Sequence, residues 1–198
     1  MATQIYLFRH GETAWSLTGQ HTGRTDLPLT SKGEMRAAQL RERLRGINFA
    51  HVLTSPLQRA SRTCELAGLG GAARIEPALQ EWNYGDYEGE TTAAIQVRRP
   101  GWDIFCDGCP NGESTEVVGA RADRIVKSLL ELDGSVAVFS HGHFLRVLAM
   151  RWIGLPLGEA RHFTLKTAAI SILGFEHANG EVPAITLWNA GDDRVSSA

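Results

Sequence analysis

The chain has 198 residues, of which 43% are hydrophobic and 21% charged, which is the composition of an ordinary globular protein. Its 20 basic and 22 acidic side chains give a net charge of -2, so no general attraction to nucleic acid or to an anionic membrane is expected. No apolar stretch approaches the roughly 20 residues that span a bilayer, and no signal peptide is evident. We therefore expect a cytoplasmic protein with one domain over residues 1–198.

The predicted elements alternate between strands and helices. This alternation indicates a three-layer α/β sandwich, with a mostly parallel central sheet and helices on both faces. The first strand is expected over 4–9, and a loop rich in Gly and Thr over 17–29. Ser31 and Glu34 have the spacing of a capping box, so a helix should begin near residue 30 or 31 and end by Gly46.

The rest of the chain continues this alternation around one irregular stretch. Residues 81–112 are rich in Gly, Trp, Asp and Pro, and a connection of that length is usually functional. The other expected elements are a strand at 51–54, a helix at 57–66, a strand near 73–75, a helix at 114–131, a strand at 135–140, a helix from Phe144 to Ile153, and strands at 168–175 and 182–188 that form a hairpin around Asn179-Gly180.

The three cysteines are too few for a disulfide framework. Cys106 and Cys109 have C-x-x-C spacing, but a structural zinc site would need two further ligands, which histidines elsewhere could supply. A redox pair normally opens a helix, whereas Gly108 and Pro110 indicate a loop. We favour a plain loop with two thiols, and we expect neither a metal nor another cofactor.

The most informative motif is Arg9-His10-Gly11-Glu12, which directly follows the apolar run 5–8. A second apolar run, 136–139, is followed in the same way by Ser140-His141-Gly142. Open α/β sheets bind their ligands at the carboxyl ends of strands. The two His-Gly pairs therefore predict two imidazoles that face each other across one pocket.

A pocket with two histidines and several arginines suits phosphoryl transfer. Histidine changes its protonation state near neutral pH, and Arg offers a planar fork of donors that fits phosphate oxygens. An imidazole nitrogen that attacks phosphorus would give a phosphohistidine and divide one difficult displacement into two easier ones. Fixed positive donors would stabilise the charge that spreads over the phosphoryl oxygens in the transition state.

The chain resembles the histidine phosphatase superfamily, also called the phosphoglycerate mutase-like family, over nearly its full length. The motifs that carry this resemblance are Leu7 to Thr13, Gly23 to Thr30, Thr54 to Ala60, Leu79 to Trp82, Gly85 to Gly89 and Ser140 to Gly142. The resemblance implies a phosphoglycerate mutase-like fold and a metal-independent phosphatase that acts on a small phosphate ester.

The resemblance also implies a role for each residue of the catalytic core. His10 matches the nucleophile, and Arg9 and Arg59 match the two arginines that clamp the transferred phosphoryl group. His141 matches the second pocket histidine, which donates to that group. Glu81 matches the acid that protonates the leaving alcohol and then activates water.

The resemblance is closer for one branch, the fungal sedoheptulose-1,7-bisphosphatases and their bacterial relatives. The segments that match this branch are 13–16, 19–20, 22–23, 25–30, 81–89, 102–114 and 141–146. The segment 102–114 carries most weight because the phosphatase chemistry does not need it, although a lid could be inherited without the substrate. The branch implies sugar phosphates or bisphosphates as substrates. The chain departs from the branch at position 21, where it has His and the branch has Tyr.

A bisphosphate needs a second anion site, for which Arg146 is the candidate. The alternative is that Arg146 is an ordinary helix residue whose side chain faces solvent. His143 is expected to be structural or to support the residues of the site. The other expected substrate contacts are Ser16, Thr22, Gly23, Tyr84 and the backbone N–H of Gly142.

Three other functions remain open at this point. They are a cofactor-dependent phosphoglycerate mutase, a phosphoprotein phosphatase or non-catalytic binding module, and a phosphatase of a cobalamin-pathway nucleotide. The mutase has Asn at the position of Ser16 and additional length before the last strands, which argues against it. We expect a small-molecule phosphate ester as partner, with neither nucleic acid nor membrane. A homodimer is left open, with Trp102 or Trp188 as candidate contacts.

Overall fold

The computed structural model describes residues 4–177 and 182–191. Its centre is a six-stranded sheet in the order β3-β2-β4-β1-β5-β6. The first four strands in this order are parallel, and β5 and β6 are antiparallel additions at one edge. The strands are β1 (Gln4–Arg9), β2 (His51–Thr54), β3 (Ala73–Ile75), β4 (Ser135–Ser140), β5 (Ile170–Phe175) and β6 (Pro183–Ala190).

The mostly parallel sheet is thus confirmed. The predicted pairing of the last two strands is also confirmed, while the expected turn at Asn179-Gly180 lies outside the described residues.

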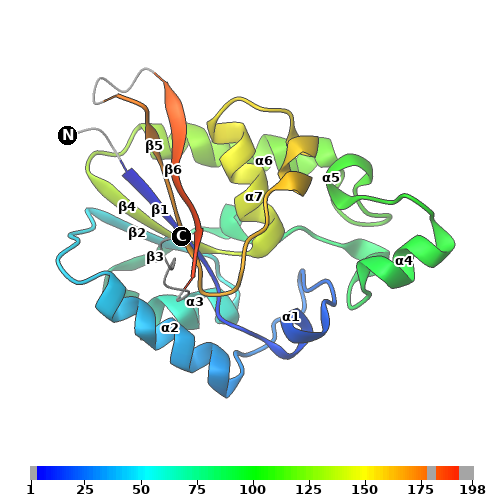
Figure 1. Cartoon of the computed structure of the whole chain (residues 1–198), viewed down its shortest axis with the longest axis horizontal. Coiled ribbons are helices and arrows are strands. Elements are labelled where there is room, and N and C mark those ends of the chain that lie inside the picture. Colours follow the sequence, from blue (N-terminus) through cyan, green and yellow to red (C-terminus); the bar gives the residue numbers. More distant parts are fainter. Residues whose placement is uncertain (1–3, 178–181, 192–198) are drawn as a thin grey trace, which may run out of the picture.

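Helices cover both faces of the sheet, as predicted (Figure 1). The longer ones are α2 (Ser31–Arg43), α3 (Gln58–Leu66), α6 (Thr115–Leu130) and α7 (Gly142–Trp152). Alternate residues of a strand point to opposite faces, and β1 follows this rule. Ile5 and Leu7 join the core under α6 and α7, whereas Phe8 joins the core under α2 and α3. Both cores consist mainly of buried aliphatic and aromatic side chains, and the burial of such apolar surface is the dominant favourable contribution to folding.

The start of α2 was predicted correctly, but its cap was not. The side chain of Thr30 accepts a hydrogen bond from the backbone N–H of Gly33, so Thr30 is the N-cap and Ser31 is the first helical residue. The helix α7 begins at Gly142, two residues before the predicted start at Phe144. This correction matters because the N-terminus of α7 reaches the end of β4.

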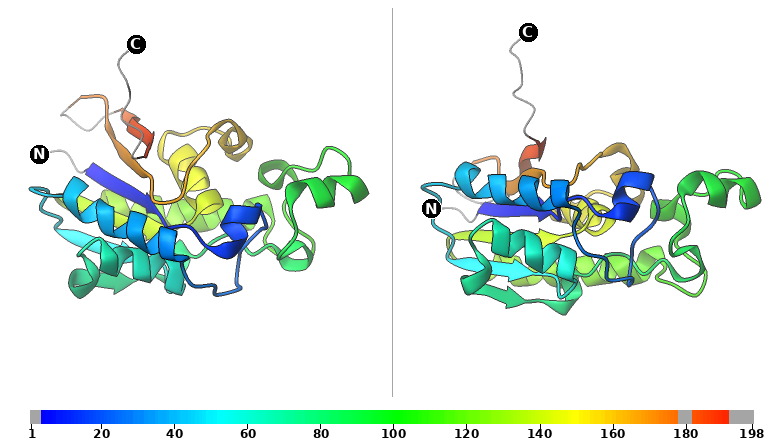
Figure 2. Two further views of the ribbon diagram at one scale, coloured as in Figure 1. Left: turned by 60° about the horizontal axis from the view of Figure 1, so that its bottom comes forward. Right: turned by 90° about the horizontal axis from the view of Figure 1, so that it is seen from below.

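The region predicted to be irregular contains two short helices, α4 (Thr92–Arg98) and α5 (Ile104–Asp107), and 3-10 turns. A further short helix, α1 (Ala14–Thr18), includes residues 17 and 18, which were predicted to begin the loop over 17–29. None of the three helices is long enough to show an apolar period in the sequence. In Figures 1 and 2, α4 and α5 extend beyond the sheet on the side where α1 also lies.

Two expectations for this region are corrected. Trp102 is 2% exposed and its indole N–H donates to the carbonyl of Gly108, so it belongs to the core and offers no dimer contact. Cys106 lies in α5 and is exposed, whereas Cys109 is buried, and both are free thiols. Within the described ranges, no helix is long and apolar enough to cross a membrane.

The connection after β1 is pressed against the start of α2 through two glycines. A Cβ on Gly33 would lie 2.2 Å from the carbonyl oxygen of Glu12, and one on Gly11 would lie 2.6 Å from the carbonyl oxygen of Gly33. Any larger residue at either position would push the two segments apart. This close packing holds the residue before Gly11, which is His10, at the end of β1.

Candidate active site

The parallel register of β1 and β4 brings the two His-Gly motifs together. Arg9 pairs with Ser140, so the residues that follow each of them are neighbours. The rings of His10 and His141 lie with their centroids 5.2 Å apart. The predicted meeting of the two imidazoles is confirmed, although only His10 lines the cavity at this end of the sheet.

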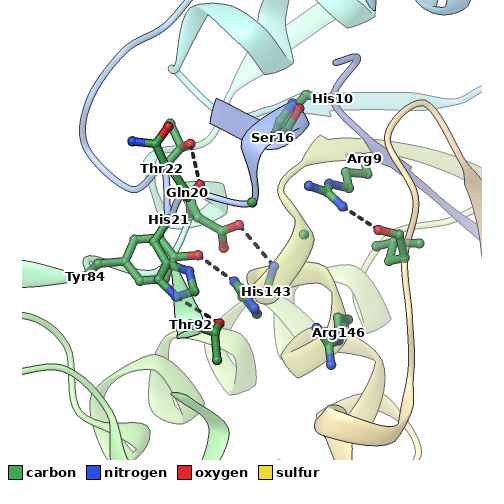
Figure 3. Close-up of a pocket in the computed structure, with 14 residues that line it drawn as sticks. Arg9, His10, Ser16, Gln20, His21, Thr22, Tyr84, Thr92, His143 and Arg146 are labelled. Atoms are coloured by element: carbon green, nitrogen blue, oxygen red, sulfur yellow. Dashed lines mark hydrogen bonds between the residues drawn. The ribbon is translucent and has the colours of Figure 1, made fainter. Parts of the chain in front are cut away.

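The cavity has a volume of about 210 Å³ and is open to solvent on one side. Eight of the eleven predicted site residues line it, and Arg59, His141 and Gly23 do not. In Figure 3, His10 lies at the top of the view, and Thr92 and Arg146 lie at the bottom. The lining residues are Arg9, His10, Ser16, Gly19, Gln20, His21, Thr22, Glu81, Tyr84, Thr92, Gly142, His143, Arg146 and Leu165.

His10 is held in the form that a nucleophile requires. Its Nδ1 lies 2.7 Å from the carbonyl oxygen of Gly11, and because a carbonyl only accepts, Nδ1 carries a proton. Burial lowers the pKa of His10 well below 6.5, and the charges of Arg9 and Arg59 lower it further. The ring is therefore neutral near pH 7, and its Nε2 carries a free lone pair.

Arg9 places an incompletely paired cation beside His10. One of its terminal N–H groups donates to the carbonyl of Leu165, but its buried Nε has no hydrogen-bond partner among the described residues. A Cβ on Gly142 would lie 3.1 Å from this guanidinium, so glycine allows it to approach the N-terminus of α7. An unsatisfied buried N–H and the first N–H groups of a helix are both suited to an anion.

Arg59 lies behind the cavity wall and holds the loop before α2. Its terminal nitrogens donate to the carbonyls of Thr22, Gly23 and Thr25, and its Nε donates to Nδ1 of His141. These four hydrogen bonds leave one of the five guanidinium N–H groups for a ligand. In this structure Arg59 is thus mainly a positioning residue, and a phosphoryl contact stays a prediction.

His141 is also occupied by protein groups. Because its Nδ1 accepts from Arg59, its Nε2 carries the proton and donates to the hydroxyl of Ser55 at 2.8 Å. Burial lowers the pKa of His141 well below 6.5, as do the charges of Arg59, His10 and Arg9. The predicted donation from His141 to a phosphoryl group would require one of these two bonds to be exchanged.

The carboxyl group of Glu81 is fixed by main-chain donors. Oε1 accepts from the N–H groups of Trp82 and Phe144, and Oε2 accepts from the N–H of His143. Two of these donors belong to the first turn of α7, so the carboxyl group is fixed against the start of this helix. Glu81 lines the same cavity as His10. This is the position expected for an acid that protonates the leaving group when His10 attacks the phosphate ester.

Arg121 and Glu113 support the segment that carries Glu81. They form a nearly buried ion pair at 2.8 Å, with side chains 11% and 15% exposed. Arg121 also donates to the carbonyls of Ala78, Gln80 and Glu81. This role of Arg121 was not predicted, because an Arg in an amphipathic helix is usually at the surface.

The remaining wall consists of hydroxyl groups, imidazoles and one cation. The hydroxyl of Ser16 accepts from the N–H of Thr13 and donates to its carbonyl, so it caps α1 while it lines the cavity. The hydroxyl of Thr22 donates to the carbonyl of Gln20. Gly23 lies off this cavity, and its N–H donates to Glu88. The structure thus gives Ser16, Thr22 and Gly23 local structural roles, and their contact with substrate stays a prediction.

Arg146 faces the cavity and does not face solvent. Its guanidinium lies 4.3 Å from the ring centre of Phe105 and donates to the carbonyl of Ala160. Burial lowers its pKa to about 10, so it remains a cation at neutral pH. No carboxylate of the described residues forms an ion pair with it, which leaves its charge available to an anion.

Several lining residues were not predicted, and they come from segments without a recognisable pattern. His21 was noted only as a departure from Tyr, and it stacks on Tyr84 with ring centres 4.7 Å apart. Thr92 opens α4 and lies 3.3 Å from Nε2 of His21. Within the described residues, no group of three or more His, Cys, Asp or Glu side chains is arranged to hold a metal ion.

The α/β fold and the pocket lined by histidine and arginine are together typical of proteins that transfer phosphoryl groups. The sequence profile of the "Histidine phosphatase superfamily (branch 1)" matches residues 5–190. The chain therefore belongs to the histidine phosphatase superfamily, and it is a phosphatase, a hydrolase of phosphate esters.

Similar proteins differ in their described activities. An acid phosphatase of Mycobacterium tuberculosis is 42% identical over 189 residues, which cover 93% of this chain and 92% of that protein. The sedoheptulose 1,7-bisphosphatase of Saccharomyces cerevisiae is 32% identical, and the match covers 94% of this chain and 93% of that protein. A protein of Cronobacter sakazakii described as "Probable phosphoglycerate mutase GpmB" is 32% identical, and the match covers 96% of this chain and 93% of that protein.

The fold agrees with a solved structure. The product of an open reading frame of Mycobacterium tuberculosis superposes with a TM-score of 0.90 at 40% identity, over 96% of this chain and 98% of that one. The predicted phosphoglycerate mutase-like α/β fold is thus confirmed.

Proposed function

We propose that the chain hydrolyses sugar phosphates or sugar bisphosphates through a phosphohistidine intermediate on His10. The observation that carries the proposal is the state of His10, a neutral ring that lines the cavity and whose Nδ1–H is bonded to Gly11, which leaves the lone pair on Nε2. The unpaired Nε of Arg9 beside it supports binding of an anion at this position.

In the first step, Nε2 of His10 attacks the phosphorus atom. The N–P bond forms as the bond from phosphorus to the sugar oxygen breaks, and protonated Glu81 gives its proton to that oxygen. Arg9 and the backbone N–H of Gly142, at the start of α7, stabilise the charge on the phosphoryl oxygens. The sugar leaves as a neutral alcohol.

In the second step, water attacks the phosphorus of the phosphohistidine. Glu81, now a carboxylate, takes a proton from the water, the N–P bond breaks, and its electron pair returns to Nε2. Phosphate leaves, and both His10 and Glu81 regain their starting states. One carboxyl group thus serves as acid and then as base, which general acid–base catalysis allows when it reaches both the alcohol and the water.

The substrate class is supported by the wall opposite His10. Arg146 supplies a partly buried positive charge without a carboxylate partner, which favours a second phosphate on the substrate. The other groups there are neutral hydrogen-bonding groups, among them Gln20, Thr22 and Thr92, which suit sugar hydroxyls. The same pocket could return the phosphoryl group to a second hydroxyl, which would make the chain a mutase.

The test is phosphate release from a panel of metabolites in the presence of EDTA. The panel contains sedoheptulose 1,7-bisphosphate, fructose 1,6-bisphosphate, fructose 6-phosphate, 3-phosphoglycerate and phosphopeptides, and each is assayed with wild type and His10→Ala. We expect release from sugar phosphates and complete loss in His10→Ala, together with loss of the acid-labile phosphoenzyme. Isomerised phosphoglycerate without free phosphate would show a mutase, and turnover in His10→Ala would exclude His10 as the nucleophile.

A further inference from the structure

Tyr84 and His143 form a hydrogen-bonded pair in the cavity wall. The phenol oxygen of Tyr84 lies 2.5 Å from Nδ1 of His143 (Figure 3). His143 precedes Arg146 by three residues in α7, so the two side chains share one face of the helix, and both line the cavity. Neither Tyr84 nor His143 takes part in the two chemical steps above, so the pair requires another explanation.

The proton of this hydrogen bond belongs to Tyr84. Tyr84 is 1% exposed, and within the described residues its hydroxyl bonds only to His143. Burial raises the pKa of Tyr84 well above 10, and the charge of Glu81 adds to this, so the phenol stays protonated. A buried O–H needs an acceptor, and Nδ1 of His143 is the acceptor present.

The position of this proton decides what His143 offers to the cavity. Burial lowers the pKa of His143 well below 6.5, helped by Arg146 and His21, so its ring is neutral. With its lone pair on Nδ1, the ring carries its one proton on Nε2. No other described residue hydrogen-bonds to this ring, so the pair presents an uncharged N–H donor with a fixed direction.

The surroundings of Tyr84 favour a fixed geometry. The ring of His21 stacks on it at 4.7 Å, and the ring of Trp102 packs against His21 with centres 5.6 Å apart. On the other side, Phe105 lies 5.2 Å from His143. A donor held in this way loses little conformational entropy when it binds a ligand.

We propose that His143 determines specificity by donating its Nε2–H to a hydroxyl oxygen of the substrate, and that Tyr84 positions this proton. The inference rests on the proposed function and deepens it, because it assigns the polyhydroxylated part of the substrate to a named donor. Arg146 attracts an anion through its charge, whereas a neutral N–H offers no such charge. The two residues therefore recognise different groups of one substrate.

The kinetic test compares a phosphate ester that has hydroxyl groups with one that has none. Wild type, His143→Phe and His143→Gln are assayed on fructose 6-phosphate and on phenyl phosphate. His143→Phe keeps a planar ring but removes the donor, so kcat/KM for fructose 6-phosphate should fall by roughly 10-fold, mainly through KM, with phenyl phosphate within about 3-fold of wild type. The amide of His143→Gln should restore most of this loss, and His162→Phe, an exposed position, should behave as wild type.

The proton position is tested directly by ¹⁵N NMR of the histidine rings at neutral pH. Wild type should show His143 neutral and protonated on Nε2. Tyr84→Phe removes the O–H that holds the lone pair on Nδ1, so it should give a mixture of the two neutral forms. A merely structural role of Tyr84 would leave the tautomer unchanged.

Three outcomes would overturn the proposed role of His143 and leave the proposed substrate class in place. These are equal loss on both esters in His143→Phe, no loss on either, or a wild-type His143 protonated on Nδ1. Absence of any activity on sugar phosphates would overturn it together with the proposed substrate class. Turnover by His10→Ala would instead exclude only the proposed nucleophile, because the comparison of the two esters does not depend on which atom attacks phosphorus.

Discussion

The cavity has two ends that are built in different ways. The end at His10 is formed by strand ends, a helix N-terminus and buried arginines, and main-chain hydrogen bonds fix its geometry. The end at Arg146 and Thr92 is formed by side chains from α4, α7 and the connections around them, whereas Ser16 of α1 lies beside His10 (Figure 3). On the proposed function this difference separates chemistry from recognition, because strand ends support the end at His10, while α7 and Thr92 of α4 supply side chains to the other. In Figure 2, α4 extends beyond the sheet.

This separation should be visible in which substrates a mutation affects. A change at the phosphoryl end should lower turnover of every ester with a comparable leaving group. A change at the distal end should alter the relative rates of different esters and leave the reaction itself intact.

The largest effect is expected for Glu81→Gln, which keeps the shape of the side chain but cannot donate and accept the proton in turn. We expect kcat to fall by about 10² to 10⁴ on all sugar phosphates, measured as phosphate release at saturating substrate. Phenyl phosphate, whose phenolate leaves more easily, should lose less in formation of the phosphohistidine. Glu42→Gln, an exposed residue on α2, is the matched control. Wild-type rates in Glu81→Gln would exclude it as the general acid.

A smaller and selective effect is expected for Arg146→Ala. If its charge binds a distal phosphate, kcat/KM for fructose 1,6-bisphosphate should fall by roughly 10- to 100-fold, and that for phenyl phosphate should change little. Arg151→Ala removes an arginine from the same helix whose partner is the partly exposed Asp123, and should affect neither substrate. Equal losses on the bisphosphate and the monoester would remove the distal-phosphate role of Arg146.

The smallest effect concerns the pH dependence of stability. Because burial lowers the pKa of His21 to about 4, the unfolded chain binds a proton below about pH 6.5 that the folded chain does not bind. The free energy of unfolding should therefore decrease as the pH falls from 6.5 toward 4, by about 1 kcal/mol per pH unit for this residue.

Urea unfolding of wild type and His21→Phe between pH 7 and pH 4.5 measures this contribution. The variant should lose less stability in acid than wild type, whereas His162→Phe, at an exposed position, should show the wild-type slope. Identical slopes for wild type and His21→Phe would mean that His21 is protonated in the folded protein.

The two ends also differ in how far the sequence predicted them. His10 and His141 could be paired because each follows a strand, and parallel strands bring their carboxyl ends to one edge. Glu81 was identified through the family resemblance, but its hydrogen bonds to α7 depend on contacts between residues 62 and 63 positions apart, which no local pattern shows. The roles of Arg59 and Arg121 were missed for the same reason, since their acceptors are carbonyl groups of distant loops.

The distal end of the cavity was predicted less completely. Tyr84 was expected to bind substrate, and His143 was interpreted only as support. Their contact spans 59 positions and requires the 3-10 turns and short helices between residues 77 and 107, whose brevity hides them from any periodic analysis. Arg146 was predicted either to bind a distal phosphate or to face solvent, and its packing on Phe105 and hydrogen bonds to Ala160 hold it in the cavity wall.

The three N–H groups that hold Glu81 have a consequence for how such an enzyme can diverge. They come from the backbone of Trp82, His143 and Phe144, and every residue except proline offers the same group. The side chain at position 143 can therefore be exchanged without removing the hydrogen bond that its own N–H makes to Glu81. If His143 and Glu81 have the proposed roles, selection can alter the substrate range at position 143 while the carboxyl group of Glu81 stays where it is.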